Sequence, residues 1–589
     1  MCGILFYLPK SGSSIPKNLF TISTKLQRHR GPDDLQIKKV GSAMFGFVRL
    51  SIVDLSNAAH QPIKFNNITG VINGELYNYI ELKEELQKLG YTFKSNGDSE
   101  VFMAAISHWG INIASKKFRG MYAAVIYDSQ ANSYSIIRDR FGIKPLYYFE
   151  NEGKLIISSE IKSILSLLNI PPSIKKRTIH NFIYKGFLDN DLNTFYSNIF
   201  KFPPASHATV VSNNSLKFIK YWQPEFSESK IFDPDELFEI LDETMNIHLR
   251  SDVKISLALS GGIDSTIISK YASKIKHVDF ISTSHSSSGM YGKQSTEAGE
   301  IEKKNIDKTV SYYGLKHRYV NTNDTEKIDT LKQILEKLDE PIKSATTIYQ
   351  FGIRKAAADS GSKVMLTGDG SDEIFAGYPK CIPPYMADLI SSHQYFYFLK
   401  SSVMLSHFYG FSPLQLIVHT IRYLRQTSQY NNYLKKMLME RLFISPMPYW
   451  LRIEDGISSA VSLETRVPFI DHKLYDYASS VKFQSFLKCG KNKTMLRQAT
   501  KRLLPPHINN QSIKMGRPGN ENSLIFGTWK ETAVNIFKND RSFLLPDDNV
   551  EKYILDSNDG KNVRFWFRAF LAHYWIKLLK EKHTNLIIK

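Results

Sequence analysis

The sequence has little cysteine and no long hydrophobic run. Three cysteines in 589 residues cannot build a disulfide framework, which indicates a reducing compartment such as the cytoplasm. No stretch approaches the roughly 18 uninterrupted apolar residues of a membrane span. The first ten residues lack the charged flank and the apolar segment of a signal peptide. We therefore expect a cytoplasmic protein with no membrane partner.

Acidic residues are also in deficit, with 57 Asp and Glu against 76 Lys and Arg, a formal net charge of +19 and a pI near 9.4. Most of the surplus lies in residues 401–589. A basic region of this kind can follow a phosphate backbone. Its charges, however, occur in short pairs such as Lys435-Lys436 and do not alternate with aromatic residues as a stacking platform requires. This pattern favours a solvated basic surface over nucleic-acid binding.

The length indicates two or more domains, and the sequence shows where they divide. A stretch rich in Pro, Ser and Asn, residues 200–225, is typical of the exit from a domain. From Lys254 onward the order of strand, glycine-rich turn and helix indicates a parallel α/β sheet. We predict domains at 2–220 and 221–589, with residues 382–450 as an aromatic-rich helical elaboration. Strands are expected at 43–53, 70–72, 122–127, 134–137 and 155–157, and helices at 81–89 and from Asp233.

The sharpest local pattern is residues 255–266, ISLALSGGIDST. An apolar strand runs into Ser-Gly-Gly, and a helix follows. Two glycines let the backbone approach a phosphate closely, and the free N–H groups of a helix N-terminus bind anions. Two glycines alone would indicate only an ordinary turn, and the string is not a Walker A loop. The full Ser-Gly-Gly-x-Asp-Ser pattern resembles the pyrophosphate-binding loop of N-type ATP pyrophosphatases.

A second strand leads into an acidic loop, residues 364–373, VMLTGDGSDE. Asp369, Asp372 and Glu373 repel one another unless a cation or basic groups lie among them. An acidic loop alone is as readily a solvated turn. Beside the first loop, it indicates a site for Mg²⁺ and pyrophosphate.

Cys2 follows the initiator methionine, and a small second residue normally permits removal of that methionine. An N-terminal cysteine carries its own base, because an α-amino group with a pKa near 8 can accept the thiol proton at neutral pH. Considered alone, a cysteine here is more often buried or incidental than catalytic. Its sequence context favours a nucleophile.

That context is broad, because strings along most of the chain resemble the glutamine-hydrolysing asparagine synthetases in the family order. The resemblance implies an N-terminal Ntn-type (N-terminal nucleophile) αββα glutaminase sandwich, a class II amidotransferase domain. A parallel-sheet ATP-pyrophosphatase domain, of the adenine nucleotide α-hydrolase type, would follow it. The matching strings are residues 1–4, 28–33, 49–54, 73–78, 97–100, 138–147, 158–160, the two nucleotide loops, 463–471 and 493–497.

By this resemblance, the thiol of Cys2 attacks the side-chain amide of glutamine. Asn73 and the backbone N–H of Gly74 would donate to the developing oxyanion. Arg49 would bind the α-carboxylate as a planar bidentate cation, and Asp98 would help to hold the ammonium group. The implied glutamine-binding residues are Arg49, Leu50, Ser51, Ile52, Val53, Asn73, Gly74, Glu75 and Asp98.

The resemblance implies a site for ATP and Mg²⁺ in the second half. An acceptor carboxylate would attack the α-phosphate of ATP to give an acyl-adenylate and pyrophosphate, and ammonia from Cys2 would cross a tunnel and displace AMP. Asp264 and Asp372 would contact Mg²⁺, Lys493 would stabilise negative charge, and Asp369 would lie at the acyl-adenylate. The implied ATP-binding residues are Leu259, Ser260, Gly261, Gly262, Asp264, Ser265, Ser282, Thr367 and Gly368.

The acceptor region departs from the family pattern. Position 369 is Asp where asparagine synthetases usually carry Glu, and residues 284–292, 344–349 and 514–519 do not follow the synthetase strings. The resemblance favours aspartate as the acceptor, with another carboxylate, such as a uronic acid in surface-polysaccharide assembly, as the alternative. A non-catalytic binding protein on the same scaffold would be expected to have lost some of the site residues. The resemblance also makes a homodimer possible.

Overall fold

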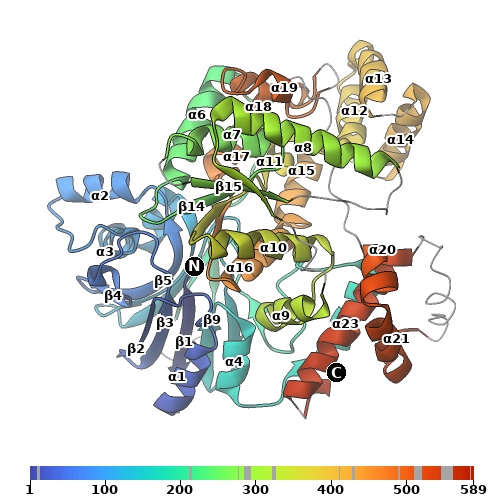
Figure 1. The fold of residues 1–589 in the computed structure, drawn as a ribbon. Helices are drawn as coiled ribbons and strands as arrows, with labels where there is room; N and C mark the ends of the chain where they lie inside the picture. The colour runs from blue at the N-terminus through green and yellow to red at the C-terminus, as the bar shows by residue number, and fades with distance from the viewer. Residues whose placement is uncertain are drawn as a thin grey trace.

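A computed structural model describes most of the chain, and every structural statement below refers to these residues: 1–9, 14–210, 215–275, 278–283, 293–320, 327–409, 412–426, 432–488, 491–509, 521–545, 562–583 and 585–589. Figure 1 shows the first third of the chain, in blue and cyan, as a strand-rich region beside a second, green to orange region.

The N-terminal region is built on two antiparallel six-stranded sheets that pack face to face. Alternate side chains of the central strands meet between them, among them Ile4, Phe6, Phe45, Val125 and Ile157, as the two-residue period of a strand requires. One sheet has the order β11 (Phe200–Lys201), β8 (Tyr147–Glu150), β9 (Lys154–Ser158), β1 (Gly3–Pro9), β3 (Ala43–Arg49), β2 (Asp34–Val40). The other has the order β13 (Phe218–Lys220), β12 (Ser206–Val210), β7 (Ser133–Arg138), β6 (Gly120–Asp128), β5 (Ile68–Leu76), β4 (Ile63–Phe65).

Helices cover the outer face of each sheet. The helices α1 (Lys17–Lys25) and α4 (Ile161–Leu168) lie on the first sheet, and α2 (Tyr79–Lys88) and α3 (Asp98–Lys117) lie on the second. These four layers follow one another in Figure 1, with α2 and α3 on one side of the strands and α1 and α4 on the other. They confirm the αββα sandwich expected for the N-terminal half.

The second region contains a five-stranded parallel sheet, which confirms the fold expected there. Its order is β16 (His317–Val320), β15 (Val278–Thr283), β14 (Ile255–Ala258), β17 (Val364–Leu366), β18 (Glu464–Arg466). The connections run outward from β14 on both sides, so the strand order reverses between β14 and β17. In open parallel sheets, ligands bind beyond the carboxyl ends of the strands at such a reversal.

Most of the predicted elements are confirmed, and their bounds show what decides them. The strand expected at 43–53 is shorter than predicted, because it ends at Arg49 and residues 50–53 form no strand. Helix α6 (Pro234–His248) begins where predicted, since the Asp233 side chain accepts hydrogen bonds from the N–H groups of Asp235 and Glu236, a standard N-cap. The other predicted strands and the helix at 81–89 correspond to β5, β6, β7, β9 and α2.

Helices surround the parallel sheet and extend from it. The predicted elaboration at 382–450 is confirmed as α12 (Ile382–Ser391), α13 (Tyr395–Tyr409), α14 (Pro413–Gln426) and α15 (Tyr433–Phe443). The remaining longer helices are α7 (Ile263–Ala272), α8 (Lys293–Tyr313), α9 (Ile328–Leu338), α10 (Thr346–Asp359), α16 (Met447–Ser459), α17 (His472–Ser480), α21 (Lys530–Asn539) and α23 (Val563–Lys582). The short helices include α5 (Lys176–His180), α11 (Ser371–Phe375), α18 (Thr494–Ala499), α19 (Pro506–Asn509) and α20 (Glu521–Ser523).

The end of the chain returns to the N-terminal region. Strand β19 (Ile587–Ile588) pairs in parallel with β10 (Ser173–Ile174), and α23 contributes to a core shared with α4 and α9. The two halves are therefore joined by the polypeptide's C-terminal segment as well as by the crossing near residue 220. None of the described helices combines the length and the hydropathy that a membrane span requires.

Candidate active sites

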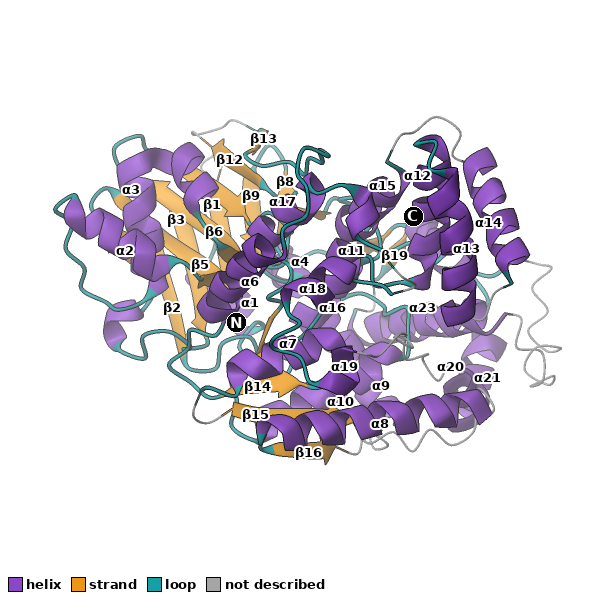
Figure 2. Ribbon diagram, turned by 90° about the horizontal axis from the view of Figure 1, so that it is seen from above, coloured by secondary structure: helices purple, strands orange, loops and turns teal. Residues whose placement is uncertain are grey.

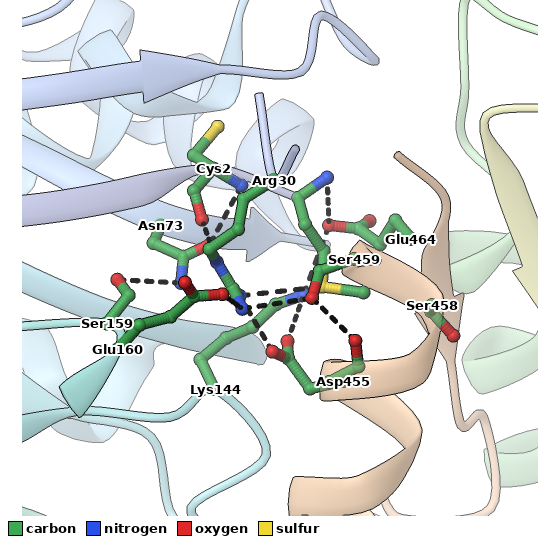
Figure 3. Close-up of polar contacts among 12 residues, drawn as sticks. Cys2, Arg30, Asn73, Lys144, Ser159, Glu160, Asp455, Ser458, Ser459 and Glu464 are labelled. Atoms are coloured by element: carbon green, nitrogen blue, oxygen red, sulfur yellow. Dashed lines mark hydrogen bonds and ion pairs between the residues drawn. The ribbon is translucent and has the colours of Figure 1, made fainter. Parts of the chain in front are cut away.

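Cys2 lies immediately before β1, at the rim where the first sheet meets the second (Figure 3). Its backbone N–H donates to Oδ1 of Asn73 over 3.0 Å, and its carbonyl oxygen accepts from Nε of Arg30 over 2.9 Å. The Asn73 amide in turn lies 3.4 Å from the Ser159 hydroxyl, to which it donates. Asn73 is thus held against the backbone of the cysteine that it is predicted to assist. We call these residues the Cys2 site.

Burial governs the protonation of the Cys2 thiol. The side chain is buried, and burial raises the pKa of the thiol, although the neighbouring terminal ammonium opposes that rise. Sγ lies 3.9 Å from the Leu50 carbonyl oxygen, which can accept the thiol proton as a hydrogen bond. A base close to Sγ is therefore needed for attack. The nitrogen of Cys2 becomes such a base only when Met1 is removed, because in this chain it is a peptide nitrogen.

Met1 itself is buried between the two halves of the molecule. Its amino nitrogen lies 3.7 Å from Oε2 of Glu464 on β18, and burial lowers the pKa of that amine. The Met1 sulfur accepts a contact from Nη2 of Arg30 over 3.6 Å. The methionine therefore fills space between Cys2 and the second domain.

The predicted glutamine-binding residues surround the same rim. Arg49 ends β3 and is buried, with its guanidinium donating to the carbonyl oxygens of Asp54 and Ser56. Leu50, Ser51, Ile52 and Val53 follow directly. The Asp98 carboxylate accepts from the Leu76 N–H over 2.7 Å, and burial raises the pKa of Asp98 to about 6.

Gly74 stands where no side chain fits. Its φ is +144°, and a Cβ there would lie 1.9 Å from the Met121 carbonyl oxygen on the neighbouring strand β6. The position therefore requires glycine. It places a backbone N–H directly after Asn73, as the predicted oxyanion site needs.

Glu75 faces the second domain. Its Oε2 lies 3.3 Å from Nη2 of Arg466 on β18, and burial, together with the nearby Glu464, raises the pKa of Glu75 well above its usual value. Its proposed contact with glutamine stays a prediction, whereas its ion pair with Arg466 is part of the contact between the domains.

A cluster of buried charges lies directly behind Cys2, as Figure 3 shows. Arg30 pairs with Asp455 over 2.7 Å and with Glu160 over 3.3 Å, and Lys144 lies 3.2 Å from Glu464. Burial opposes ionisation of Glu464, but Lys144, the terminal ammonium and Arg466 lower its pKa to about 2. Sequence reasoning missed this cluster. Arg30, Lys144 and Glu464 lie in the family strings, but nothing in the strings shows which residues pair.

The nucleotide loop follows β14 in the second domain. The N–H of Ser260 donates to Oγ of Ser265 over 3.1 Å, and Oγ of Ser282 donates to the Leu259 carbonyl over 2.6 Å. Gly261 has φ of +60°, and a Cβ there would lie 2.8 Å from the Glu302 carbonyl oxygen. Gly262 precedes α7 without a capping side chain. The first N–H groups of α7 are thus oriented to receive an anion.

Lys493 joins the two loops on which ATP and Mg²⁺ are predicted to bind. Its Nζ lies 2.6 Å from Oδ1 of Asp264 and 2.5 Å from Oδ1 of Asp372. Asp264 also accepts from the Ser371 hydroxyl over 2.7 Å. Lys493 is 1% exposed, so these charges are neutralised within the protein. We call this group the Lys493 site.

Two glycines allow this close approach. A Cβ at Gly377 would lie 1.8 Å from Oδ1 of Asp372 and 2.4 Å from Cε of Lys493, and one at Gly368 would lie 2.8 Å from Cβ of Asp264. Gly368 was predicted from the resemblance. The part played by Gly377 was not, because its closeness to Lys493 is a tertiary contact.

The carboxylates of Asp264 and Asp372 fit a divalent cation. Both already converge on one positive charge, the Lys493 ammonium, and carboxylate oxygens are the ligands that Mg²⁺ prefers. Among the described residues, no group of three or more His, Cys, Asp or Glu side chains could hold a metal. A cation at this site would therefore complete its shell with phosphate and water oxygens.

Asp369 lies at the edge of the Lys493 site, beside a second buried ion pair. Its Oδ2 accepts from the Thr367 hydroxyl over 2.6 Å. Glu454 on α16 is paired with the fully buried Arg354 of α10, yet burial raises the pKa of Glu454 to about 7, and Asp369 adds to that rise. Of the stretches that depart from the family strings, 344–349 is described, whereas 284–292 and 514–519 lie outside the described residues.

Arg466 connects the two sites. Its carbonyl oxygen accepts from the N–H of Thr367, at the start of the acidic loop, over 3.1 Å. Its guanidinium pairs with Glu75 and, over 3.1 Å, with Glu464. A single residue of β18 therefore contacts the loop of the Lys493 site through its backbone and, through its side chain, Glu75 on the strand that carries Asn73 of the Cys2 site.

Two family models match the chain. The model described as a glutamine amidotransferase domain matches residues 1–222, and the model described as asparagine synthase matches residues 236–571. The chain is 28% identical over 564 residues to asparagine synthetase [glutamine-hydrolyzing] 1 of Bacillus subtilis, covering 88% of this chain and 87% of that protein. It is 30% identical over 418 residues to a putative asparagine synthetase of Methanocaldococcus jannaschii, covering 66% and 78%.

Other similar proteins have different names. Amidase chry2 of Gibberella zeae is 26% identical over 602 residues, covering 87% of this chain and 88% of that protein. Among solved structures, the glutamine phosphoribosylpyrophosphate amidotransferase of B. subtilis is 14% identical, with a TM-score of 0.29, covering 51% of this chain and 70% of that one.

Proposed function

Because this chain belongs to the asparagine synthase family, we propose that it is an ATP-dependent, glutamine-hydrolysing asparagine synthetase. It would convert aspartate, glutamine and ATP to asparagine, glutamate, AMP and pyrophosphate. The observation that carries the proposal is the presence of both sites in one chain. Cys2 and Asn73 lie in the N-terminal sandwich, and Lys493 lies between the two nucleotide loops of the parallel sheet.

In the first half-reaction, the Cys2 sulfur attacks the side-chain amide carbon of glutamine. The thiol proton passes to the α-amino nitrogen that Met1 removal frees, and then to the leaving ammonia. Asn73 and the Gly74 N–H stabilise the oxyanion, and water then cleaves the thioester to give glutamate. Arg49 and Asp98 are proposed to hold the ends of the substrate, with Asp98 acting as a carboxylate.

In the second half-reaction, an oxygen of the acceptor carboxylate attacks the α-phosphorus of ATP, and the bond to pyrophosphate breaks. Ser260, Gly261, Gly262 and Ser265 would hold the phosphates through N–H and hydroxyl groups. Ammonia then attacks the acyl carbon, and AMP leaves with the bonding electron pair. The joined domains protect the acyl-adenylate from water while ammonia arrives.

Asp264 and Asp372 would hold Mg²⁺, which supplies charge neutralisation to the phosphates when bound. Lys493 contacts both carboxylates in the described structure. The side chain would release one or both of them to the cation and turn its ammonium to phosphate oxygen, where negative charge develops.

One observation favours a second candidate acceptor, a carboxylate other than aspartate. Position 369 is Asp, and Arg354, the buried cation beside Glu454, is already paired with Glu454 and bonded to Gln350. An aspartate acceptor has an α-carboxylate that needs a cation of its own. Amidation of a carboxylate without that group, such as a uronic acid, would not need one.

The test is pyrophosphate release from ATP and Mg²⁺ with ammonium as the nitrogen donor, measured across a panel of carboxylic acids. Aspartate-dependent release with asparagine as the product is the expected result. Glutaminase activity without aspartate-dependent release would overturn the aspartate assignment. Release with uronic acids would then establish the second acceptor.

A further inference from the structure

Helices α13 and α14 carry large apolar side chains that point away from the molecule. On α13, Phe396 is 73% exposed, Leu399 is 60% and Val403 is 62%; on α14, Leu414 is 70% exposed. Further exposed apolar residues of the same helices are Tyr395, Tyr397, Val418 and Ile421. Single exposed apolar residues are normal on a soluble protein, but a group of them indicates a binding surface.

These residues form one stripe on each helix. Phe396, Leu399 and Val403 are spaced i, i+3, i+7, and Leu414, Val418 and Ile421 are spaced i, i+4, i+7, so each set shares a helix face. The opposite faces are buried, with Leu405 and Leu416 in the core of the second domain. Both helices pack on α12, at the edge of the molecule (Figures 1 and 2). We call the six residues the apolar face.

The charge beside the apolar face has one sign. Lys400 and Arg422 are exposed on the same two helices. The sequence contains no Asp or Glu between Asp388 and Glu440, whereas Lys400, Arg422, Arg425, Lys435 and Lys436 fall in that interval. The apolar face therefore lies within an exclusively basic segment.

This charge pattern distinguishes between possible occupants. In a two-fold symmetric contact, the face meets its own copy. Lys400 and Arg422 would then meet identical cations, with no carboxylate of the segment to pair with them, which opposes association. An anionic lipid surface satisfies both features, because it takes up apolar and aromatic side chains and attracts Lys and Arg. Tyr395 and Tyr397 are of a residue type enriched at membrane–water interfaces.

We propose that the apolar face docks on anionic membrane surfaces, with α13 and α14 lying in the plane of the interface. No described helix is a candidate membrane span, so the contact is peripheral. This revises the expectation that the protein has no membrane partner. The contact is independent of the acceptor and of the amidotransferase reaction.

The experiment is flotation of the full-length protein with vesicles of phosphatidylcholine alone and of phosphatidylcholine with about 30% phosphatidylglycerol. Binding to the anionic vesicles, weakened by salt, is the expected result. The variants Lys400→Gln and Arg422→Gln should each weaken binding about fivefold, at roughly 1 kcal/mol for each cation near the surface. The triple variant Phe396→Ser, Leu399→Ser, Val403→Ser should abolish it.

Matched controls are Lys316→Gln, at a residue whose side chain is 85% exposed, and Ile231→Ser, at a residue that is 81% exposed; both should bind as the parent does. Retained pyrophosphate release shows that each variant is folded. If the triple variant does not fold, the two cation variants are sufficient to test the proposal. Absence of binding to anionic vesicles at low salt overturns the proposal. Equal vesicle binding by the cation variants and the parent also overturns it. A third contrary result is a protein that binds no vesicles and instead forms a dimer through this face, as light scattering would show by a dimer that the triple variant does not form.

Discussion

The Cys2 site and the Lys493 site place their charges differently with respect to the reacting atoms. Around Cys2, the groups hydrogen-bonded to the sulfur and to the backbone nitrogen are neutral, namely the Leu50 carbonyl and the Asn73 amide. The ions lie behind them and pair across the domains, as Arg30 does with Asp455. In the Lys493 site, the ions are themselves the predicted ligands, and they pair with each other.

The difference indicates how each site is prepared for its substrate. Neutral groups that surrounding ion pairs hold in place should need little rearrangement when an amide binds, so we expect the Cys2 site to be preorganised. The Lys493 site must exchange partners, because buried ions are stable only while they are paired. We therefore expect ATP and Mg²⁺ to bind together at the Lys493 site. Mg²⁺ would replace Lys493 as the partner of the carboxylates, and the phosphates of ATP would replace the carboxylates as the partner of Lys493.

The variant Cys2→Ala should distinguish the activities of the two sites most clearly. Removing the nucleophile should lower glutamine-dependent synthesis by at least about 10⁴-fold, since no other group can form the thioester. Ammonium-dependent synthesis should stay within about twofold of the parent, because the Lys493 site is untouched. Amide product from each nitrogen donor is the measurement. A variant that uses glutamine as well as the parent does would remove Cys2 from the mechanism.

The converse change is Lys493→Met, which keeps most of the side-chain length and removes the charge. Pyrophosphate release should fall by about 10²–10³-fold, the usual loss when one stabilising donor is removed. Glutamine hydrolysis without ATP should persist. The variant should also need a different Mg²⁺ concentration, because Asp264 and Asp372 lose their internal cation. Unchanged Mg²⁺ dependence would contradict the exchange of partners described above.

The contact between the domains can be tested by a double-mutant cycle on Glu75 and Arg466. Glu75→Gln, Arg466→Gln and the double variant should give a coupling free energy of about 1–3 kcal/mol in unfolding. If Arg466 couples the two sites, any stimulation of glutamine hydrolysis by ATP and acceptor should be smaller in Arg466→Gln and unchanged in Glu81→Gln, which alters the more exposed pair with Arg250. Additive stabilities would show that the Glu75–Arg466 pair contributes no coupling of its own.

The smallest expected effect concerns Asp98. Burial raises the pKa of this carboxyl group to about 6. A carboxylate is needed to hold the glutamine ammonium, so protonation of Asp98 should steepen the fall of kcat/KM for glutamine below pH 6. It should add about tenfold per pH unit to the fall that protonation of the Cys2 α-amine causes below about pH 8. Ammonium-dependent synthesis, compared at equal concentrations of free NH₃, should lack this added limb. In Asp98→Asn, kcat/KM should be low and its slope should no longer steepen below pH 6. Retention of the limb in that variant would assign it to another group.

The sequence was most informative where short strings carry chemistry. The turn at Ser260–Gly262 and the acidic loop that contains Asp372 follow from residue types at fixed spacing, whereas the roles of Asp264, Asp372 and Gly74 were implied by the family resemblance. Their surroundings agree: φ at Gly74 and Gly261 is positive, and a side chain at either position would meet backbone oxygen. Local patterns also predicted the β-sandwich strands and the α6 cap, because strand alternation and N-caps are properties of neighbouring residues.

Pairing between distant residues was not predictable in the same way. Arg466 was part of a family string, but nothing in its neighbours indicates that its carbonyl contacts Thr367 and its side chain contacts Glu75. The same is true of the Arg30–Asp455 pair, whose members are separated by 425 positions. The return of β19 to β10 was likewise missed, since two residues of strand leave no distinct period.

The burial of Met1 limits when this residue can be removed from the chain. Cys2 can have a free amine only after Met1 is cleaved, yet in the closed molecule Met1 is 1% exposed and lies against Glu464. On the mechanism proposed above, a peptidase would therefore act before the second domain closes over the first. During synthesis at roughly 5–20 residues per second, Glu464 emerges about 20–90 s after Met1. The nascent chain would thus have a limited interval for the removal of Met1, and a molecule that folds with Met1 in place would lack the amine proposed to accept the thiol proton.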